Sequence, residues 1–149
     1  YIVGKGGDEA QAGGTAISLA YSIILDNNGI IGGGGGGGGY TTGANYRAGG
    51  GGGAGFDVGI KGTTQSAGGS STYGENGTLE SGGDGGSIIT PDAEPLTATG
   101  GTGGNLGSSG GNGTGDGTRV NGGAAGAAIE LNGYTLTTTN LGDVRGSNS

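Results

Sequence analysis

The sequence predicts an irregular glycine-rich fold: a bundle (sandwich) of polyglycine II helices joined by loops, on a small antiparallel β base, with little or no α-helix. Three observations predict this class. First, 47 of the 149 residues are Gly and only 2 are Pro, and the glycines lie in blocks, whereas collagen needs a three-residue repeat and abundant Pro. Second, Ile, Leu, Val and Phe together number 23, too few to stabilise so long a chain through an apolar core. Third, the two ends of the chain are poor in Gly blocks and carry strand-like patterns.

The first element is an N-terminal β segment of the base, residues 1–31. Apolar residues alternate with small or polar ones over residues 17–23, which is the two-residue period of a half-buried strand. The pair Asn28 and Gly29 then separates two short apolar runs, and this predicts a two-residue turn at which both residues are structural.

The second element is the polyglycine II bundle with its display loops, residues 32–128. Such a helix has three residues per turn and directs its backbone groups outward, and the absence of Cβ lets neighbouring helices approach closely enough to bond laterally. The uninterrupted blocks 32–39 and 49–53 are predicted in the middle, with Gly35 and Gly51 structural. The residues that interrupt other blocks are predicted to face solvent: Asp84, Thr102, Asn112, Thr114 and Asp116.

The third element is a C-terminal β-hairpin and tail, residues 129–149. A turn at Asn132 and Gly133 would place Leu131 opposite Tyr134 and bring their side chains to one face. A lone hairpin is marginal in water, so its apolar face is predicted to pack on the N-terminal strands. The three elements together form one domain.

Composition excludes several function classes. The net charge is -7, with five Lys and Arg against twelve Asp and Glu, which argues against a nucleic-acid partner. No His and no Cys are present, so the commonest general base and metal ligands are missing. No apolar run is long enough to insert in a membrane. We therefore predict no enzyme activity, no catalytic residue, no metal and no cofactor. The stretch 110–118 is similar to the calcium-binding nonapeptide of parallel β-rolls, but Gly115 stands where that repeat has Asp, and no second copy stacks on it.

The residues of most functional interest are aromatic or basic. If the glycine blocks run alternately up and down, residues 40–48 form a loop at the far tip, residues 56–67 a loop at the base, and residues 70–81 a further tip loop. Exposed Tyr and Arg on rigid scaffolds dominate recognition surfaces. Candidate receptor-binding residues are Tyr40, Tyr46, Arg47 and Tyr73. The alternative is that these rings cover the bundle ends and shield backbone bonds.

The stretch DNNGIIGGGGGGGGY at 26–40, followed by further Gly blocks and closed by NGGAAGAAIELNGYTL at 121–136, resembles the glycine-rich receptor-binding domains of tailed-phage tail fibre and tail-tip proteins. The distal-tip adhesins of T-even-like phages are the nearest in architecture. The resemblance implies a sandwich of polyglycine II helices in the virion tail, outside the cell. It also implies that loops at the distal end bind a bacterial outer-membrane protein or surface glycan, and that the rest of the tail fibre or tail tip is a partner.

Two readings from other classes remain open at this point. The chain could be a structural subunit of a bacterial extracellular or surface filament, in which exposed strand edges pair with neighbouring copies. It could also be an ice-binding polyglycine bundle, but that family uses more regular repeats and disulfides, and this chain has no Cys.

Overall fold

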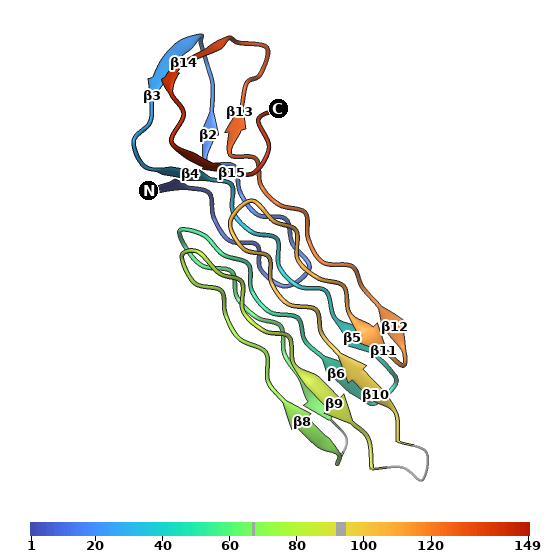
Figure 1. The fold of residues 1–149 in the computed structure, drawn as a ribbon. Helices are drawn as coiled ribbons and strands as arrows, with labels where there is room; N and C mark the ends of the chain where they lie inside the picture. The colour runs from blue at the N-terminus through green and yellow to red at the C-terminus, as the bar shows by residue number, and fades with distance from the viewer. Residues whose placement is uncertain (67, 92–94) are drawn as a thin grey trace.

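The computed structural model describes residues 1–66, 68–91 and 95–149. These ranges contain no helix and only short strands, gathered at the two ends of an elongated molecule (Figure 1). The predicted lack of α-helix is confirmed for the described residues. The strands are β1 (Ile2–Val3), β2 (Ile17–Ser18), β3 (Ile23–Asp26), β4 (Ile30–Gly32), β5 (Thr41–Thr42), β6 (Tyr46–Ala48), β7 (Gln65–Ser66), β8 (Ser70–Thr72), β9 (Ser87–Ile89), β10 (Thr97–Thr99), β11 (Thr114–Gly115), β12 (Thr118–Arg119), β13 (Ile129–Glu130), β14 (Leu136–Asn140) and β15 (Asp143–Arg145).

Extended glycine-rich segments run side by side between these two ends (Figure 1). The segment 32–39 is buried throughout and bonds to six other segments of the bundle and, at Gly33, to Arg145 of β15. Its successive N–H groups donate to three neighbours in rotation, and the same neighbour returns every third residue. The donor and acceptor pairs, at 2.7–3.0 Å, are Gly34 to Gly14, Gly35 to Ala54, Gly36 to Ser108, Gly37 to Gln11, Gly38 to Gly51 and Gly39 to Gly111.

The carbonyl groups of segment 32–39 follow the same three-residue rotation. Gly7 donates to Gly35 at 2.8 Å and Gly104 donates to Gly36 at 2.8 Å. Segment 49–55 repeats the arrangement, since its backbone bonds to segments 7–9, 33–39, 59–62, 75–78, 83–86 and 101–104. Both segments are buried, so the prediction that 32–39 and 49–53 lie in the middle is confirmed.

The outer segments show the same three-residue period in the burial of their residues. In each of the segments 81–86 and 121–126, the first residue is exposed, the second half-buried and the third buried, and the next three residues repeat this order. The interrupting residues fall in the exposed rows as predicted; all five are exposed, namely Asp84, Thr102, Asn112, Thr114 and Asp116. Among the described residues the apolar clusters lie at the two ends of the molecule, so lateral backbone bonds hold its middle together.

One end of the molecule is a three-sided coil of parallel strands, which we call the base coil. Its first turn, rung 1, contains β2, β3 and β4, and its second turn, rung 2, contains β13, β14 and β15. Each strand of rung 1 pairs in parallel with the corresponding strand of rung 2. The inward side chains form an apolar cluster centred on Leu19, Ile31, Ala128 and Ile129. Residues 33–127, which form most of the bundle and the far end, thus lie in the sequence between two successive turns of one coil.

The predicted antiparallel base and C-terminal hairpin are wrong. Asn132 and Gly133 do form a turn, with φ values of 50° and 82°, and the N–H of Tyr134 donates to the Leu131 carbonyl at 2.8 Å. However, β13 and β14 on either side of this turn pair with β2 and β3 and not with each other. The turn is a corner of the coil, and the C-terminal strands join the N-terminal ones through a parallel ladder.

The turn predicted at Asn28 and Gly29 is also a corner and not a hairpin. It links β3 and β4, which belong to different sheets. The buried side chain of Asn27 holds this corner, because its Oδ1 accepts from the Gly29 N–H at 2.9 Å and its Nδ2 donates to the Leu141 carbonyl at 2.7 Å.

The predicted boundary at residue 31 stays a prediction, but part of the segment before it lies in the bundle. Residues 4–14 leave the base coil and join the bundle, where Gly4 and Gly7 donate to Gly32 and Gly35. The predicted base loop 56–67 is likewise only partly at the base. Residues 59–62 bond along the flank of segment 50–53, and β7 lies in a sheet at the far end with β5 and β6. Ala67 lies outside the described residues.

A clamp of charged side chains ties the base coil to the turn at 78–81. Arg145 on β15 donates to Glu80 at 3.0 Å and lies 2.9 Å from Asp143, and the Tyr1 hydroxyl donates to Glu80. This last bond raises the pKa of Tyr1 and, together with the bond from Arg145, lowers the pKa of Glu80. The hydrogen bonds to Asp143 and Glu80 also raise the pKa of Arg145.

Candidate functional site

The end opposite the base coil is a small sandwich of two four-stranded antiparallel sheets. One sheet has the order β12-β5-β6-β7 and the other β11-β10-β9-β8. Ala48, Ile88 and Ala98 are buried between the sheets, and Tyr46 packs against them. Thr41 is also buried, with its hydroxyl oxygen within 3.1 Å of two carbonyl oxygens. We define the tip surface as the connections between these strands: residues 43–45, 68–69, 90–91, 95–96 and 116–117.

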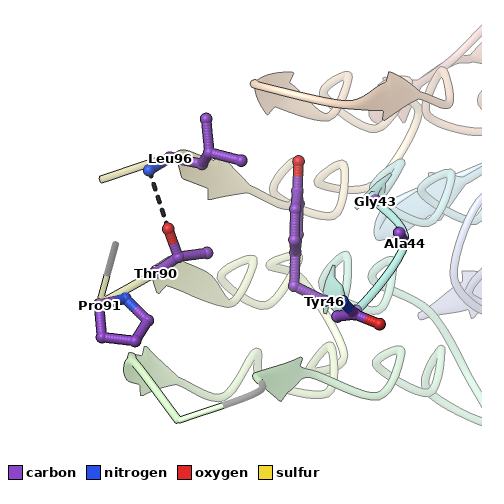
Figure 2. Close-up of a pocket in the computed structure, with 7 residues that line it drawn as sticks. Gly43, Ala44, Tyr46, Thr90, Pro91 and Leu96 are labelled. Atoms are coloured by element: carbon purple, nitrogen blue, oxygen red, sulfur yellow. Dashed lines mark hydrogen bonds between the residues drawn. The ribbon is translucent and has the colours of Figure 1, made fainter. Parts of the chain in front are cut away.

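A cleft of about 350 Å³ opens on the tip surface. Figure 2 shows the ring of Tyr46 standing between the Gly43 side of the cleft and the side formed by Thr90, Pro91 and Leu96. A Cβ added at Gly43 would overlap the Tyr46 ring, so one face of the ring is packed against backbone. The ring lies across the cleft from Thr90, Pro91 and Leu96 (Figure 2). The lining consists of Gly43, Ala44, Asn45, Tyr46, Thr90, Pro91 and Leu96.

The polar groups around this cleft hold the loops in place. The Tyr46 hydroxyl donates to the Asp116 carbonyl at 2.9 Å, and the Thr97 N–H donates to Asp116 Oδ2 at 3.0 Å. Across the β9–β10 connection, the Leu96 N–H donates to Thr90 Oγ1 at 2.9 Å (Figure 2). The cleft therefore offers an aromatic ring and aliphatic walls, with no charged side chain among its described lining residues.

Tyr40 and Arg47 lie together on the flank next to the sandwich. The Arg47 guanidinium stands 4.2 Å from the centroid of the Tyr40 ring. It also donates to the Thr63 carbonyl at 2.7 Å and pairs with Glu9. The second oxygen of Glu9 accepts from the Gly50 N–H at 2.7 Å. Arg47 thus bonds to two other segments of the bundle, at Thr63 and Glu9, and Glu9 extends this network to Gly50.

Tyr73 stands apart from the other three candidates. It follows β8, its side chain is 70% exposed, and it is not among the residues that line the cleft. The structure therefore places Tyr46 in a cleft, joins Tyr40 to Arg47, and leaves Tyr73 as a separate exposed ring. Whether any of the four contacts a receptor stays a prediction.

Sequence reasoning missed Thr90, Pro91 and Leu96, which form one wall of the cleft. The signal was the segment TPDAEP, in which two Pro residues bracket a short polar stretch between two apolar ones. That pattern is typical of a tight connection between strands. Residues 92–94 of this segment lie outside the described residues.

The described residues hold no group of three or more His, Cys, Asp or Glu side chains that could bind a metal ion. Asp116, in the calcium-like stretch, instead bonds to the Thr97 backbone. Gly115 and Gly117 have φ values of 96° and 104°, so they serve the turn between β11 and β12. Over the same residues, no helix has the length and apolar character to cross a membrane.

Comparisons with known proteins agree with this architecture. The model of the family described as phage tail fibre adhesin Gp38 matches residues 1–149. Among solved structures, the chain is similar to one in the crystal structure of the gp37-gp38 adhesin tip complex of the bacteriophage S16 long tail fiber, with 27% identity and a TM-score of 0.58. That match covers 99% of this chain and 53% of the other, so the chain spans about half of its relative's length. No curated protein matches.

The match to the adhesin family model extends over the full length of the chain, and the structural relative has the same fold over nearly all of it. Adhesins are binding proteins and not enzymes, in agreement with a chain that lacks His and Cys. The chain therefore belongs to the phage tail fibre adhesin Gp38 family.

Proposed function

We propose that this chain attaches the phage to its host by binding a bacterial cell-surface receptor through the tip surface. The observation that carries the proposal is the Tyr46 cleft, which opens at the end of the molecule opposite the base coil. Exposed aromatic rings in concave sites are typical anchors of protein recognition. An outer-membrane protein or a surface glycan would be the receptor.

Two of the four candidate residues would contact the receptor, and the other two would support them. Tyr46 would contact the receptor through the face of its ring that is not packed against Gly43, and Tyr73, which follows the end of β8 away from residues 68–69, would add a second exposed ring on the flank. Tyr40 and Arg47 would act as supports, because Arg47 already bonds to Glu9 and Thr63 and stacks on Tyr40. The rigidity of these supports would limit the entropy lost on binding.

Similarity to the S16 structure suggests where the chain sits in the virion. That relative is described in a complex with gp37 at the adhesin tip of the long tail fiber. We propose the same place for this chain, at the distal end of a long tail fibre and bound to a fibre protein. The base coil would then face the fibre and the tip surface the cell.

The glycine segments are proposed to be polyglycine II helices. The support is the return of each hydrogen-bonding neighbour at every third residue of segment 32–39, together with the three-residue burial period of segments 81–86 and 121–126. Three residues per turn is the repeat of this helix, whereas a β-strand repeats every two. An amide infrared spectrum of the polyglycine II type tests this; a spectrum with β-sheet bands alone contradicts it.

Binding of the purified chain to whole susceptible cells tests the receptor proposal. Leu96→Asp places a charge in the wall of the cleft and is expected to weaken cell binding roughly tenfold or more. The matched control is Leu79→Asp, since Leu79 is 41% exposed and Leu96 is 40% exposed, but Leu79 lies at the turn near the base. Normal cell binding by Leu96→Asp would overturn the role of the cleft.

A further inference from the structure

The two walls of the tip cleft come from different sheets of the sandwich. Tyr46 begins β6 in one sheet, and Gly43 lies in the connection that leads to it from β5. Thr90 and Leu96 lie in the connection between β9 and β10 of the other sheet. Figure 2 shows these walls on opposite sides of the cleft. The width of the cleft therefore depends on how the two sheets are held relative to each other at the tip.

Asp116 bonds to both walls. Its N–H donates to the Thr97 carbonyl at 2.7 Å, and its Oδ2 accepts from the Thr97 N–H at 3.0 Å. Its own carbonyl accepts from the Tyr46 hydroxyl at 2.9 Å. Thr97 directly follows Leu96, yet Asp116 is not among the residues that line the cleft. Asp116 thus joins the ring on one wall to the backbone of the other wall without occupying the space between them.

The residues on either side of Asp116 allow this close approach. Asp116 lies in the connection from β11 to β12, which passes from one sheet to the other. A Cβ at Gly115 would overlap the Thr97 carbonyl, and a Cβ at Gly117 would overlap the Thr42 carbonyl and crowd the Tyr46 hydroxyl. Glycine at both positions therefore lets Asp116 reach the two sheets at once.

The Tyr46 ring is held at two points. One face packs against the backbone at Gly43, where an added Cβ would overlap the ring. The hydroxyl at the far end of the ring is fixed by the Asp116 carbonyl. A ring held in one orientation loses little freedom when a ligand binds, and binding is correspondingly tighter than to a ring that must first be ordered. The affinity of the cleft should therefore depend on the position of Asp116.

We propose that Asp116 is a positioning residue of the receptor-binding cleft, which sets the width of the cleft and the orientation of the Tyr46 ring. This inference rests on the proposed function of the cleft and adds to it a residue that acts through Tyr46 and Thr97. The carboxylate serves as an acceptor for the Thr97 N–H and not as a charge presented to the receptor. An uncharged acceptor at the same place would serve as well.

Binding to susceptible cells tests the role of the carboxylate through three variants. Asp116→Ala removes the acceptor for Thr97 and is expected to weaken cell binding roughly three- to tenfold. Asp116→Asn keeps an oxygen acceptor and should restore most of that loss. The matched control is Asp84→Ala, which removes another exposed Asp, from the glycine segment 81–86, and should bind cells like the original chain. Urea unfolding establishes that each variant is folded under the conditions of the binding assay.

A second measurement needs no receptor. Asp116→Ala should change the near-ultraviolet circular dichroism of the tyrosines, because the Tyr46 ring loses its fixed orientation. The same replacement in a Tyr46→Phe background should change the tyrosine signal much less, since the ring whose position it controls is no longer a tyrosine. Equal changes in the two backgrounds, or no change in either, would overturn the proposal.

The outcomes separate this inference from the receptor proposal. Normal cell binding by Asp116→Ala, alongside weakened binding by Leu96→Asp, would overturn the positioning role and leave the receptor proposal standing. Equal losses in Asp116→Asn and Asp116→Ala would show that the charge itself meets the receptor, which also overturns the positioning role. Normal binding by Leu96→Asp would contradict the receptor proposal, and the circular dichroism comparison would then decide alone whether Asp116 orients the ring.

Discussion

The replacement Gly35→Ala tests most directly how the bundle is held together. Gly35 is buried in segment 32–39, and a Cβ there would overlap the carbonyl of Gly104. The segment carrying Gly104 must move, which strains its bonds from Ala54 at 3.0 Å and to Gly36 at 2.8 Å. A single methyl group thereby disturbs three neighbouring segments at once.

The expected magnitude follows from those contacts. Two buried backbone groups left poorly bonded cost about 1–2 kcal/mol each, and forcing a methyl group into a packed interior costs about 1–3 kcal/mol. The smaller entropy of the unfolded Ala chain offsets about 0.4–1 kcal/mol. The net loss is about 2–6 kcal/mol, a large share of the stability of an ordinary domain.

Urea unfolding followed by tyrosine fluorescence measures this loss, since the chain has six Tyr and no Trp. The control is Gly29→Ala, because a Cβ at Gly29 would meet only Asn27 Oδ1 at 3.7 Å. That variant should be as stable as the original chain or slightly more so. If Gly35→Ala lost less than about 1 kcal/mol, the bundle would not be closely packed through its backbone and the reasoning would fail.

Three further predictions concern side chains. Arg47→Ala leaves the Glu9 carboxylate without its cation in a half-buried site, and we expect a loss of about 1–3 kcal/mol in urea unfolding; an unchanged midpoint would contradict the supporting role. Glu80→Gln should lower the unfolding midpoint at neutral pH. Because the folded pKa of Glu80 is lowered from 4.5, the difference should shrink as pH falls through that lowered value, and a difference independent of pH would refute the clamp with Tyr1. Thr41→Val removes a buried hydroxyl whose single proton is shared between two carbonyl oxygens within 3.1 Å, and it should cost about 1–3 kcal/mol, measured in the same way; a neutral effect would show that these carbonyls do not need this donor.

The bundle could be predicted from the sequence because its physical cause is visible there. Unbroken Gly blocks allow close backbone approach, and the residues that interrupt the other blocks mark the solvent side. Both inferences hold in the structure, from the buried segment 32–39 to the exposed Asp84 and Thr102.

The base coil could not be predicted by local rules. Asn132 and Gly133 correctly predict a turn, but a turn signal does not state which strands pair beyond it. The missed signal was a repeat: AISL at 16–19 recurs as AIEL at 128–131, and each is followed by a Tyr two residues before the next inward side chain. Two similar segments separated by the whole bundle indicate successive turns of one coil.

Of the three parts of the fold, the sandwich at the tip is the one that the sequence pattern indicates least. Its strands are two or three residues long and rich in Ser and Thr. Three of them contribute one residue each to the buried apolar cluster: β6 Ala48, β9 Ile88 and β10 Ala98. Such short strands show no alternation from which their existence could be read. The cleft depends on how these strands pair, so Tyr46 could be singled out from the sequence but the wall opposite its ring could not.

The alternating directions of the glycine segments have a mechanical consequence. Segment 32–39 bonds laterally to antiparallel partners such as 51–54, and these bonds lie across the long axis of the molecule (Figure 1). If, as proposed, the tip surface binds a cell and the base coil faces the fibre, tension between the two acts along the segments and shears many such bonds at the same time. Rupture then requires them to fail together, so the scaffold should resist tension far better than the modest strength of one backbone hydrogen bond suggests.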